Sequence, residues 1–428
     1  MAKLQVLGLI LGTALSVGCK QEGFEVKPIG GETSCVAEAC GTPGENKVPR
    51  PMPAPSAPPV ATATPVATAT PRPSATPAPT ATPAAEISSA RVLFSGHSLL
   101  SWPVANFVDS AARSLSLSHK YQEQMRGGSS IRVRTRGSGA DGSTSFPGYS
   151  DTANLDRDWR PIDVLSELRT GASIGGDRYD TLVITERHDL MNVIFDQDTV
   201  RHLRHSHERG IAANPGSQTY FYAPWLSHKV DKIRAWITYE KTVHAGWDCV
   251  ATRINHSLAA EGRNDRVKGI PANIALADLV ERAIGGSVPG VSGGTDTDVL
   301  RRLFNDDVHL STLGSYYISM VTLASVYRRS PVGAWRPPEV SAQQAETLQT
   351  LAWNFVSSYY ASHQPRTLAQ CQALMPDLCS AFWNFDWLYA NRPDMVPSCQ
   401  ERLRRQDTTN PFFYSSSSDR NWWLPAPQ

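Results

Sequence analysis

The 428-residue sequence lacks an excess of charge of either sign. Its 41 Lys and Arg residues are balanced by 40 Asp and Glu residues, which gives a formal net charge of +1 at pH 7. A protein that binds nucleic acid without sequence preference needs a basic excess to neutralise phosphates. The sequence is not typical of that class of protein, and no nucleic-acid partner is expected.

Long apolar runs and cysteine are also scarce. After the first twenty residues no run of about 18 apolar residues occurs, so no internal membrane-spanning helix is expected. Seven cysteines are too few for a small disulfide scaffold but suffice for a few disulfides in an oxidising compartment. Because no Cys-x-x-Cys pair is present, we expect no zinc site; no other metal or cofactor is implied.

The first 18 residues have the pattern of a signal peptide. Lys3 gives a positive start, residues 4–17 form a short apolar core, and Cys19 follows it closely. The segment ending at Cys19 resembles a bacterial lipoprotein cleavage site, although Ser16 stands where such sites usually have Leu. This resemblance implies an exported protein held in the cell envelope, at the outer membrane or cell surface, by a lipid anchor on Cys19. An ordinary secretory signal is the alternative.

The six cysteines that remain favour disulfides, because their number is even and the chain is predicted to be exported. They are Cys35, Cys40, Cys249, Cys371, Cys379 and Cys399. Cys35 and Cys40 share the short segment 19–50 and form the simplest pair. The other four allow three pairings, among which the sequence does not choose.

Residues 51–86 are predicted to be a disordered linker. Up to residue 85 this stretch is almost entirely Pro, Ala, Thr, Val and Ser, and eleven of its residues are Pro. Such a composition cannot bury enough apolar surface to offset the entropy lost on folding. In polyproline geometry the linker reaches on the order of 100 Å. It would therefore hold a folded domain at residues 91–330 well away from a membrane anchor.

Short β-branched segments alternate with helical patterns along that domain. Strands are predicted at residues 91–95, 131–135, 180–185, 218–223 and 266–270, and helices at 104–115, 199–207, 232–259 and 273–283. Strands joined by helical crossovers form a parallel sheet with helices on both faces. We therefore predict a three-layer α/β/α fold, followed at residues 331–428 by a helical extension that contains disulfides. Sites in such sheets lie at the carboxyl ends of the strands.

Two loops of the predicted sheet carry residue types used in nucleophilic catalysis. Ser98 follows the first strand, in the sequence Ser-Gly-His-Ser-Leu. His309 follows Asp306 by three residues, so the carboxylate can accept a ring proton and orient the imidazole toward a serine hydroxyl. Taken singly, a helix-capping serine and a capping aspartate beside a surface histidine are the ordinary interpretations.

Together, Gly-x-Ser-Leu after the first strand and Asp-x-x-His before the last helix resemble the first and last blocks of the SGNH (GDSL-like) hydrolase family. Residues 270–273, Ile-Pro-Ala-Asn, are similar to the family's segment upstream of the Asp-x-x-His loop. The resemblance implies Ser98 as the nucleophile, His309 as the general base and Asp306 as the group that orients His309. Asp307 is the competing carboxylate.

The same resemblance implies an oxyanion hole made by the Ser98 N–H, a glycine after the second strand and a side chain after the third. With the second strand at 131–135, Gly142 is the first choice for the glycine and Gly139 the alternative. This glycine-rich run also reads Gly-x-Gly-x-x-Gly, but no helix is predicted after it, so a dinucleotide site is not expected. His188 stands after the third strand and completes the predicted hole.

Three positions depart from the family pattern. His188 replaces an Asn, Glu186 replaces a Gly, and His97 replaces the Asp of the GDSL signature. An imidazole can donate one hydrogen bond, so the hole can survive the first change. Losing one oxyanion donor costs about 10²- to 10³-fold in turnover. The departures therefore concern the level of activity more than the fold.

Other motifs have ordinary structural interpretations. His202, His205 and His207 do not share one helical face, which favours a solvated basic helix over a metal site. Trp225, at the end of the fourth strand, is predicted either to line the cleft or to lie in the core. The extension holds Trp383, Trp387, Trp422 and Trp423. Burial of these rings is expected, with stacking on sugars as the alternative.

The sequence thus predicts an exported serine esterase that cleaves or transfers acyl groups, with O-acetyl groups on carbohydrate as the expected substrate. The alternative is a non-catalytic, lipid-anchored glycan-binding protein at the cell surface that retains the fold. It would use Trp225 and the tryptophans of the extension. If a sugar hydroxyl replaces water as the acceptor, the same residues make an acyltransferase.

Overall fold

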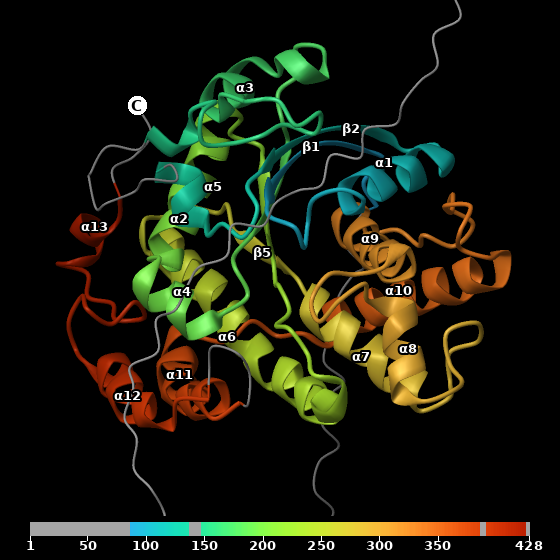
Figure 1. The fold of residues 1–428 in the computed structure, drawn as a ribbon. Coiled ribbons are helices and arrows are strands. Elements are labelled where there is room, and N and C mark those ends of the chain that lie inside the picture. The colour runs from blue at the N-terminus through green and yellow to red at the C-terminus, as the bar shows by residue number, and fades with distance from the viewer. Residues whose placement is uncertain (1–85, 137–146, 386–390, 425–428) are drawn as a thin grey trace, which may run out of the picture. The chain divides into compact units, whose positions relative to one another are not determined.

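Five strands of the described chain form one parallel sheet in the order β2-β1-β3-β4-β5 (Figure 1). Their bounds are β1 Ser89–Gly96, β2 Ser118–Met125, β3 Thr181–Thr185, β4 Gln218–Tyr222 and β5 Val267–Ile270. All four strand pairs are parallel, so the carboxyl ends of the strands meet at one edge of the sheet. The predicted α/β class is confirmed.

The computed structural model describes residues 86–136, 147–385 and 391–424. These residues belong to a unit that spans Ala78–Gln428. The predicted signal peptide, Cys19, Cys35, Cys40 and nearly all of the linker lie outside the described residues, as do Gly139, Gly142 and Trp387. In the part of the chain that is described, no helix combines the length and apolar composition needed to cross a membrane.

The second strand was predicted in the wrong place. Residues 131–135 belong to a helix, α2 (Ile131–Arg136), while β2 lies upstream in the polar sequence Ser-His-Lys-Tyr-Gln-Glu-Gln-Met. The Ser130 carbonyl accepts the N–H of Arg134, and its hydroxyl accepts the N–H of Val133, so Ser130 starts the helix. Alternating β-branched residues and arginines gave this segment the two-residue period of a strand.

Helices cover both faces of the sheet (Figure 1). One face carries α1 (Val104–Ser114), α7 (Ala272–Ile284), α8 (Asp296–Leu303), α9 (Thr312–Tyr327) and α10 (Ala342–Ser362). The other carries α4 (Leu190–Asp196), α5 (Thr199–Ala213), α6 (Ile233–Ala260), α11 (Leu368–Trp383) and α12 (Val396–Arg404). Shorter helices are α3 (Val164–Thr170) and α13 (Asp419–Trp422). This is the three-layer arrangement predicted from the sequence.

Alternation along the strands explains why two cores form. In β3, Val183 packs into the core of α1, α7 and α9, whereas Leu182 and Ile184 pack into the core of α5 and α6. In β4, Tyr222 and Phe221 divide in the same way. Successive side chains of a strand point to opposite faces, so a strand buried on both faces is apolar at consecutive positions.

Two disulfides hold the C-terminal extension: one links it to the sheet domain and the other lies within it. Cys249 of α6 is bonded to Cys371 of α11, and Cys379 of α11 to Cys399 of α12. This settles which of the three possible pairings occurs. The extension is therefore covalently linked to the helical layer that packs on the sheet.

Candidate active site

Ser98, His309 and Asp306 come together at the carboxyl edge of the sheet. The His309 Nε2 atom lies 2.9 Å from the Ser98 Oγ atom, and His309 Nδ1 lies 2.7 Å from Asp306 Oδ2. These are hydrogen-bond distances. Residues 98 and 309 are separated by 211 positions along the chain, and the parallel sheet brings their loops to the same edge. The three residues have the geometry of a nucleophile, a general base and an orienting carboxylate.

The turn after β1 presents Ser98 to solvent. In this turn the N–H groups of Leu100 and Ser101 both donate to the carbonyl of His97, which closes one helical turn. Ser98 is exposed, whereas His97 and Leu99 on either side of it are buried. At Gly96 a β-carbon would meet side-chain atoms of Leu100 and Thr185 at 3.0 Å, so the close approach of this turn to β3 favours glycine.

Asp306 is held in position by its own loop. Its Oδ1 atom accepts the N–H groups of Val308 (2.8 Å) and His309 (2.6 Å), leaving Oδ2 for the His309 ring. Burial raises the pKa of the Asp306 carboxyl, but these donors and the His309 ring outweigh it, and the net pKa is lowered. Asp306 is therefore a stable carboxylate. The neighbouring Asp307 contributes its backbone carbonyl, which accepts the His228 N–H at 2.8 Å.

His97 ties the Ser98 turn to the loop after β3. Its Nε2 atom lies 2.9 Å from the carbonyl oxygen of Glu186. Because a carbonyl only accepts, Nε2 carries the proton. Burial, followed by the positive charge of Arg134, lowers the pKa of His97 to about 3, so the ring is neutral at neutral pH. His97 is thus a neutral hydrogen-bond donor that joins the turn of Ser98 to the loop after β3.

Glu186 is a buried junction behind this loop. Its Oε1 atom accepts the N–H groups of Ile131 (3.1 Å) and Arg187 (2.7 Å), and Oε2 accepts the Thr199 hydroxyl (2.8 Å). The side chain therefore holds the loop after β3 against the starts of α2 and α5. Burial raises the pKa of Glu186 to about 7, against the opposing charge of Arg134.

Arg134 joins the ends of three strands. Its buried guanidinium donates to the Ser95 hydroxyl at 3.0 Å, to the Ser129 carbonyl at 2.9 Å and to the Thr185 carbonyl. These groups belong to the end of β1, the loop after β2 and the end of β3. Sequence reasoning missed Arg134 because it took the segment for a strand.

His188 lies in the same site as Ser98, His309 and Asp306. It is partly buried after β3, and burial lowers its pKa, with further effects from nearby charges that include His309 and Asp307. The lowered pKa favours a neutral imidazole, which can donate one N–H. The structure thus places His188 near the Ser98–His309 pair.

The glycine predicted for the oxyanion hole stays a prediction, although the strand that preceded it was misplaced. Gly142 lies outside the described residues, and the strand that pointed to it is α2. The loop that does follow β2 contains Gly127 and Gly128, both exposed, with Gly128 in the left-handed region at φ +61°. The Arg126 N–H donates to the Gly96 carbonyl at 3.1 Å, so this loop lies against the turn of Ser98.

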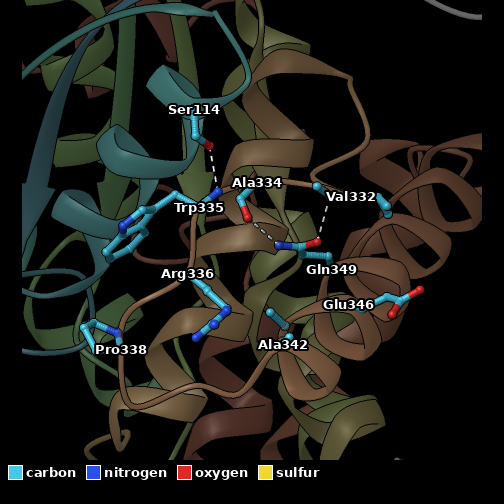
Figure 2. A pocket seen from close by; sticks show the side chains of 11 residues that line it. Ser114, Val332, Ala334, Trp335, Arg336, Pro338, Ala342, Glu346 and Gln349 are labelled. Atoms are coloured by element: carbon cyan, nitrogen blue, oxygen red, sulfur yellow. Dashed lines mark hydrogen bonds between the residues drawn. The ribbon is translucent and has the colours of Figure 1, made fainter.

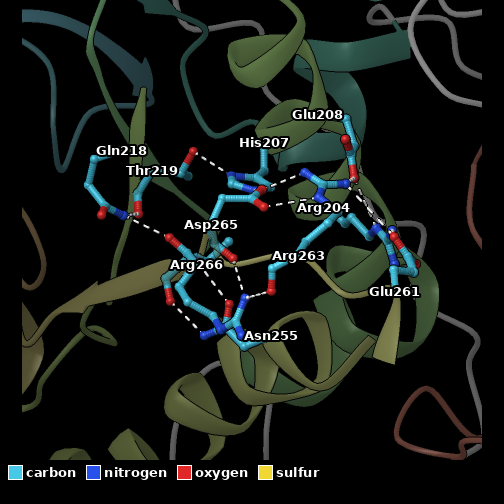
Figure 3. A network of polar contacts seen from close by, with 11 residues as sticks. Arg204, His207, Glu208, Gln218, Thr219, Asn255, Glu261, Arg263, Asp265 and Arg266 are labelled. Atoms are coloured by element: carbon cyan, nitrogen blue, oxygen red, sulfur yellow. Dashed lines mark hydrogen bonds and ion pairs between the residues drawn. The ribbon is translucent and has the colours of Figure 1, made fainter. Parts of the chain in front are cut away.

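The His-rich patch on α5 is structural (Figure 3). His207 is fully buried, with Nδ1 2.9 Å from the Thr219 hydroxyl and Nε2 2.7 Å from Asp265. His202 bonds to the Thr135 hydroxyl at 2.7 Å. The predicted solvated helix is therefore wrong: this face of α5 is packed, and Arg204 on it pairs with Glu261 at 2.6 Å. Within the described ranges no cluster of His, Cys, Asp and Glu could hold a metal ion.

Four of the tryptophans considered for glycan contact lie among the described residues, and these four are engaged within the protein. Trp225 is fully buried, and its indole N–H donates to the Val308 carbonyl at 2.9 Å, so it supports the Asp306 loop from the core. Trp383 is buried too. Trp422 and Trp423 are partly buried, and both rings lie 4.9 Å from the guanidinium carbon of Arg253.

A cavity of about 770 Å³ lies away from these residues (Figure 2). It is lined by Trp335, Arg336 and Gln349 among others, between the chain after α9 and the start of α10. The Trp335 N–H donates to Ser114 at the far end of α1, and Gln349 bonds to Ala334 at 2.9 Å. Since α1 and α9 both start at the triad edge, this cavity lies at the opposite ends of those helices.

Comparison with known proteins gives one distant likeness. No family model and no curated protein matches the sequence. The structure is similar, with a TM-score of 0.44 and 12% sequence identity, to the crystal structure of a DUF4886 family protein from Bacteroides uniformis ATCC 8492. The match covers 65% of this chain and 98% of that one. It is too distant to support an argument about activity, which must rest on the site itself.

Proposed function

We propose that this protein is a serine esterase of the SGNH type. The observation that carries the proposal is the hydrogen-bonded series Ser98–His309–Asp306, in which residues distant in sequence meet at the carboxyl edge of a parallel sheet. Activation of a serine hydroxyl by an oriented imidazole is the usual route to acyl transfer. The order of the motifs along the chain, similar to that of the SGNH family, supports the same reaction class.

The reaction proceeds in two halves. The Ser98 oxygen bonds to the ester carbonyl carbon while its proton passes to His309 Nε2. The carbon–oxygen bond to the alcohol then breaks, and His309 returns the proton to the leaving oxygen. Water attacks the acyl-enzyme in the second half, His309 takes the water proton, and the acid departs as Ser98 regains its hydrogen. Asp306 stabilises the charged imidazole throughout.

The negative oxygen of each tetrahedral intermediate requires preorganised donors. We assign this role to the Ser98 N–H, the N–H of Gly127 or Gly128, and the neutral ring of His188. The contacts of His97 and Glu186 support the assignment, since they fix the turn of Ser98 against the loop that carries His188.

Neutral O-acetylated carbohydrate is the substrate class we propose. The triad is open, with 44% of the His309 side chain and 51% of the Asp306 side chain exposed, which suits a short acyl group on a bulky polar carrier. Export and lipidation of Cys19 are a further part of the proposal, supported by residues 1–19, which lie outside the described structure. Loss of palmitate labelling in Cys19→Ala would support this part, and unchanged labelling would exclude it.

The first test is hydrolysis of p-nitrophenyl acetate by the purified protein. Ser98→Ala should lower kcat at least about 10³-fold, because it removes the hydroxyl that is hydrogen-bonded to His309. Asp306→Asn should cost a similar factor, because the imidazole loses its orienting charge. Asp307→Asn is the matched control and should change kcat less than about twofold.

One result would decide against the esterase, and another against the role of Asp306. Equal rates for the wild type and Ser98→Ala would show that the serine does no chemistry and would favour the glycan-binding alternative. Equal losses in Asp306→Asn and Asp307→Asn would show that loop folding, not orientation of His309, is being measured. Capture of the acetyl group by an added sugar would identify the acyltransferase variant of the same mechanism.

A further inference from the structure

We propose that Trp102 is the platform on which the alcohol part of the ester, a neutral sugar ring, stacks during catalysis. This inference rests on the proposed function and adds a residue that selects the substrate. Trp102 lies four residues after Ser98, in the same turn, and is separated from α1 by Pro103 alone.

Exposure is the first observation that distinguishes Trp102. Its indole is 67% exposed, although tryptophan is usually among the more buried residues. Ser98 and Trp102 are both exposed, while Leu99, Leu100 and Ser101 between them are buried. Ser98 and Trp102 are thus the two exposed positions of this stretch, and the three residues between them face the core.

The second observation is the side of the site on which Trp102 lies. Helices α1 and α9 pack side by side on the same face of the sheet, and the Ser319 hydroxyl of α9 donates to the Val104 carbonyl of α1 at 3.1 Å (Figure 1). Trp102 leads into α1 and His309 leads into α9. His188, in contrast, follows β3, a central strand of the sheet.

This placement assigns the two halves of an ester. The carbonyl oxygen must face the donors that include His188, and the leaving oxygen must face His309, which returns the proton to it. The alcohol part of the substrate therefore extends toward the α1–α9 side, where Trp102 is exposed. A flat indole offers apolar area to the C–H face of a pyranose ring at little conformational cost.

Charge at the site restricts the alcohol further. Asp306 and Asp307 are both exposed beside His309, and an anionic carrier such as a uronate or a phospholipid would be repelled by them. A neutral sugar avoids this repulsion and still presents an apolar ring face. The residues around His309 thus favour an uncharged carbohydrate ester.

The test compares two acetyl esters that differ in the alcohol: methyl acetate, and a methyl glucoside that carries one acetyl group. Trp102→Ala should lower the ratio of kcat/KM for the sugar acetate to kcat/KM for methyl acetate by about 5- to 10-fold. Trp102→Phe, which keeps an aromatic face, should restore most of the ratio. Trp159→Ala is the matched control. Trp159 is also exposed (61%), but it belongs to a different loop, the one after Leu155, which pairs with Met125 at the end of β2.

An unchanged ratio in Trp102→Ala, or an equal fall in Trp159→Ala, would overturn the inference while leaving the esterase intact. If the wild type hydrolyses neither ester, the proposed function fails. Binding of the acetylated glucoside then tests whether Trp102 contacts a sugar. Saturation-transfer NMR of the acetylated glucoside with Ser98→Ala should then show contact to the ring protons. Persistence of that contact when Trp102→Ala is added would reject the platform.

Discussion

At the scale of single residues, buried polar side chains organise the candidate site from behind. His97 bonds to the Glu186 carbonyl, and Glu186 accepts three hydrogen bonds from different segments. Arg134 is buried beside them and donates to the ends of β1 and β3. Most of these contacts join segments that are distant in sequence, so the geometry around Ser98 depends on residues behind the site.

Glu186 gives this arrangement a testable pH dependence. Its pKa is raised from 4.5 to about 7, mainly by burial, so the folded state holds its proton more tightly than the unfolded state. The stabilisation this provides is complete below about pH 4.5 and is lost as the pH rises through about 7. In Glu186→Gln, which has the same shape and cannot ionise, this loss should be absent.

Urea unfolding at pH 5 and at pH 8 measures the effect. The free energy of unfolding of Glu186→Gln, relative to the wild type, should rise between the two pH values by up to about 3 kcal/mol. The wild type serves as the reference at each pH, which removes the titration of other buried groups such as Glu240. Parallel pH profiles for the two proteins would contradict the shifted pKa.

At the scale of secondary-structure elements, the sequence predicts strands β1 and β3 and the site residues after them, but it does not predict β2. The apolar, β-branched sequences of β1 and β3 identify them as buried strands, and Ser98 follows the first directly. Strand β2 escaped prediction because its buried residues are polar: Gln124, for example, accepts from Ser95 at 2.7 Å and donates to Asn154 at 2.8 Å. Such partners lie far away in sequence, so no local pattern reveals that a glutamine is inside.

The two disulfides of the extension should contribute different amounts to the free energy of unfolding. Cys249 and Cys371 are separated by 122 positions, whereas Cys379 and Cys399 are separated by 20. In the chain-entropy description, closing the longer loop stabilises by about 5 kcal/mol and the shorter by about 3 kcal/mol. Replacing Cys249 and Cys371 with Ala should therefore lower the free energy of unfolding more than replacing Cys379 and Cys399. Denaturant melts of the two double variants test this, and an equal or reversed order would refute it.

At the scale of the whole molecule, the extension is held on the sheet domain by a buried ion pair as well as by a disulfide. Arg253 of α6 is buried and forms an ion pair with Asp419 of α13, and its guanidinium carbon lies 4.9 Å from the rings of both Trp422 and Trp423. Sequence reasoning assigned the extension its disulfides and helices. It could not predict this contact, because the partner of the terminal tryptophans is an arginine some 170 positions earlier in the chain.

Asp419→Ala should therefore destabilise the protein strongly. Removing the carboxylate leaves the Arg253 guanidinium buried without its charge partner, which costs about 3 kcal/mol or more. The control is Asp394→Ala, which breaks the exposed pair with Arg392 and should lower stability far less, because water screens an exposed ion pair. Thermal unfolding followed by circular dichroism compares the two variants. Similar shifts in Tm would show that Arg253 does not depend on Asp419.

The distance along the chain between Ser98 and His309 also has a consequence for biosynthesis. A ribosome completes the nucleophile more than two hundred residues before it completes the base, and the two approach one another only when the sheet between them has assembled. A growing or still unfolded polypeptide therefore carries a serine of ordinary reactivity. Under the proposed mechanism, the onset of hydrolysis would itself report that the sheet domain has finished folding.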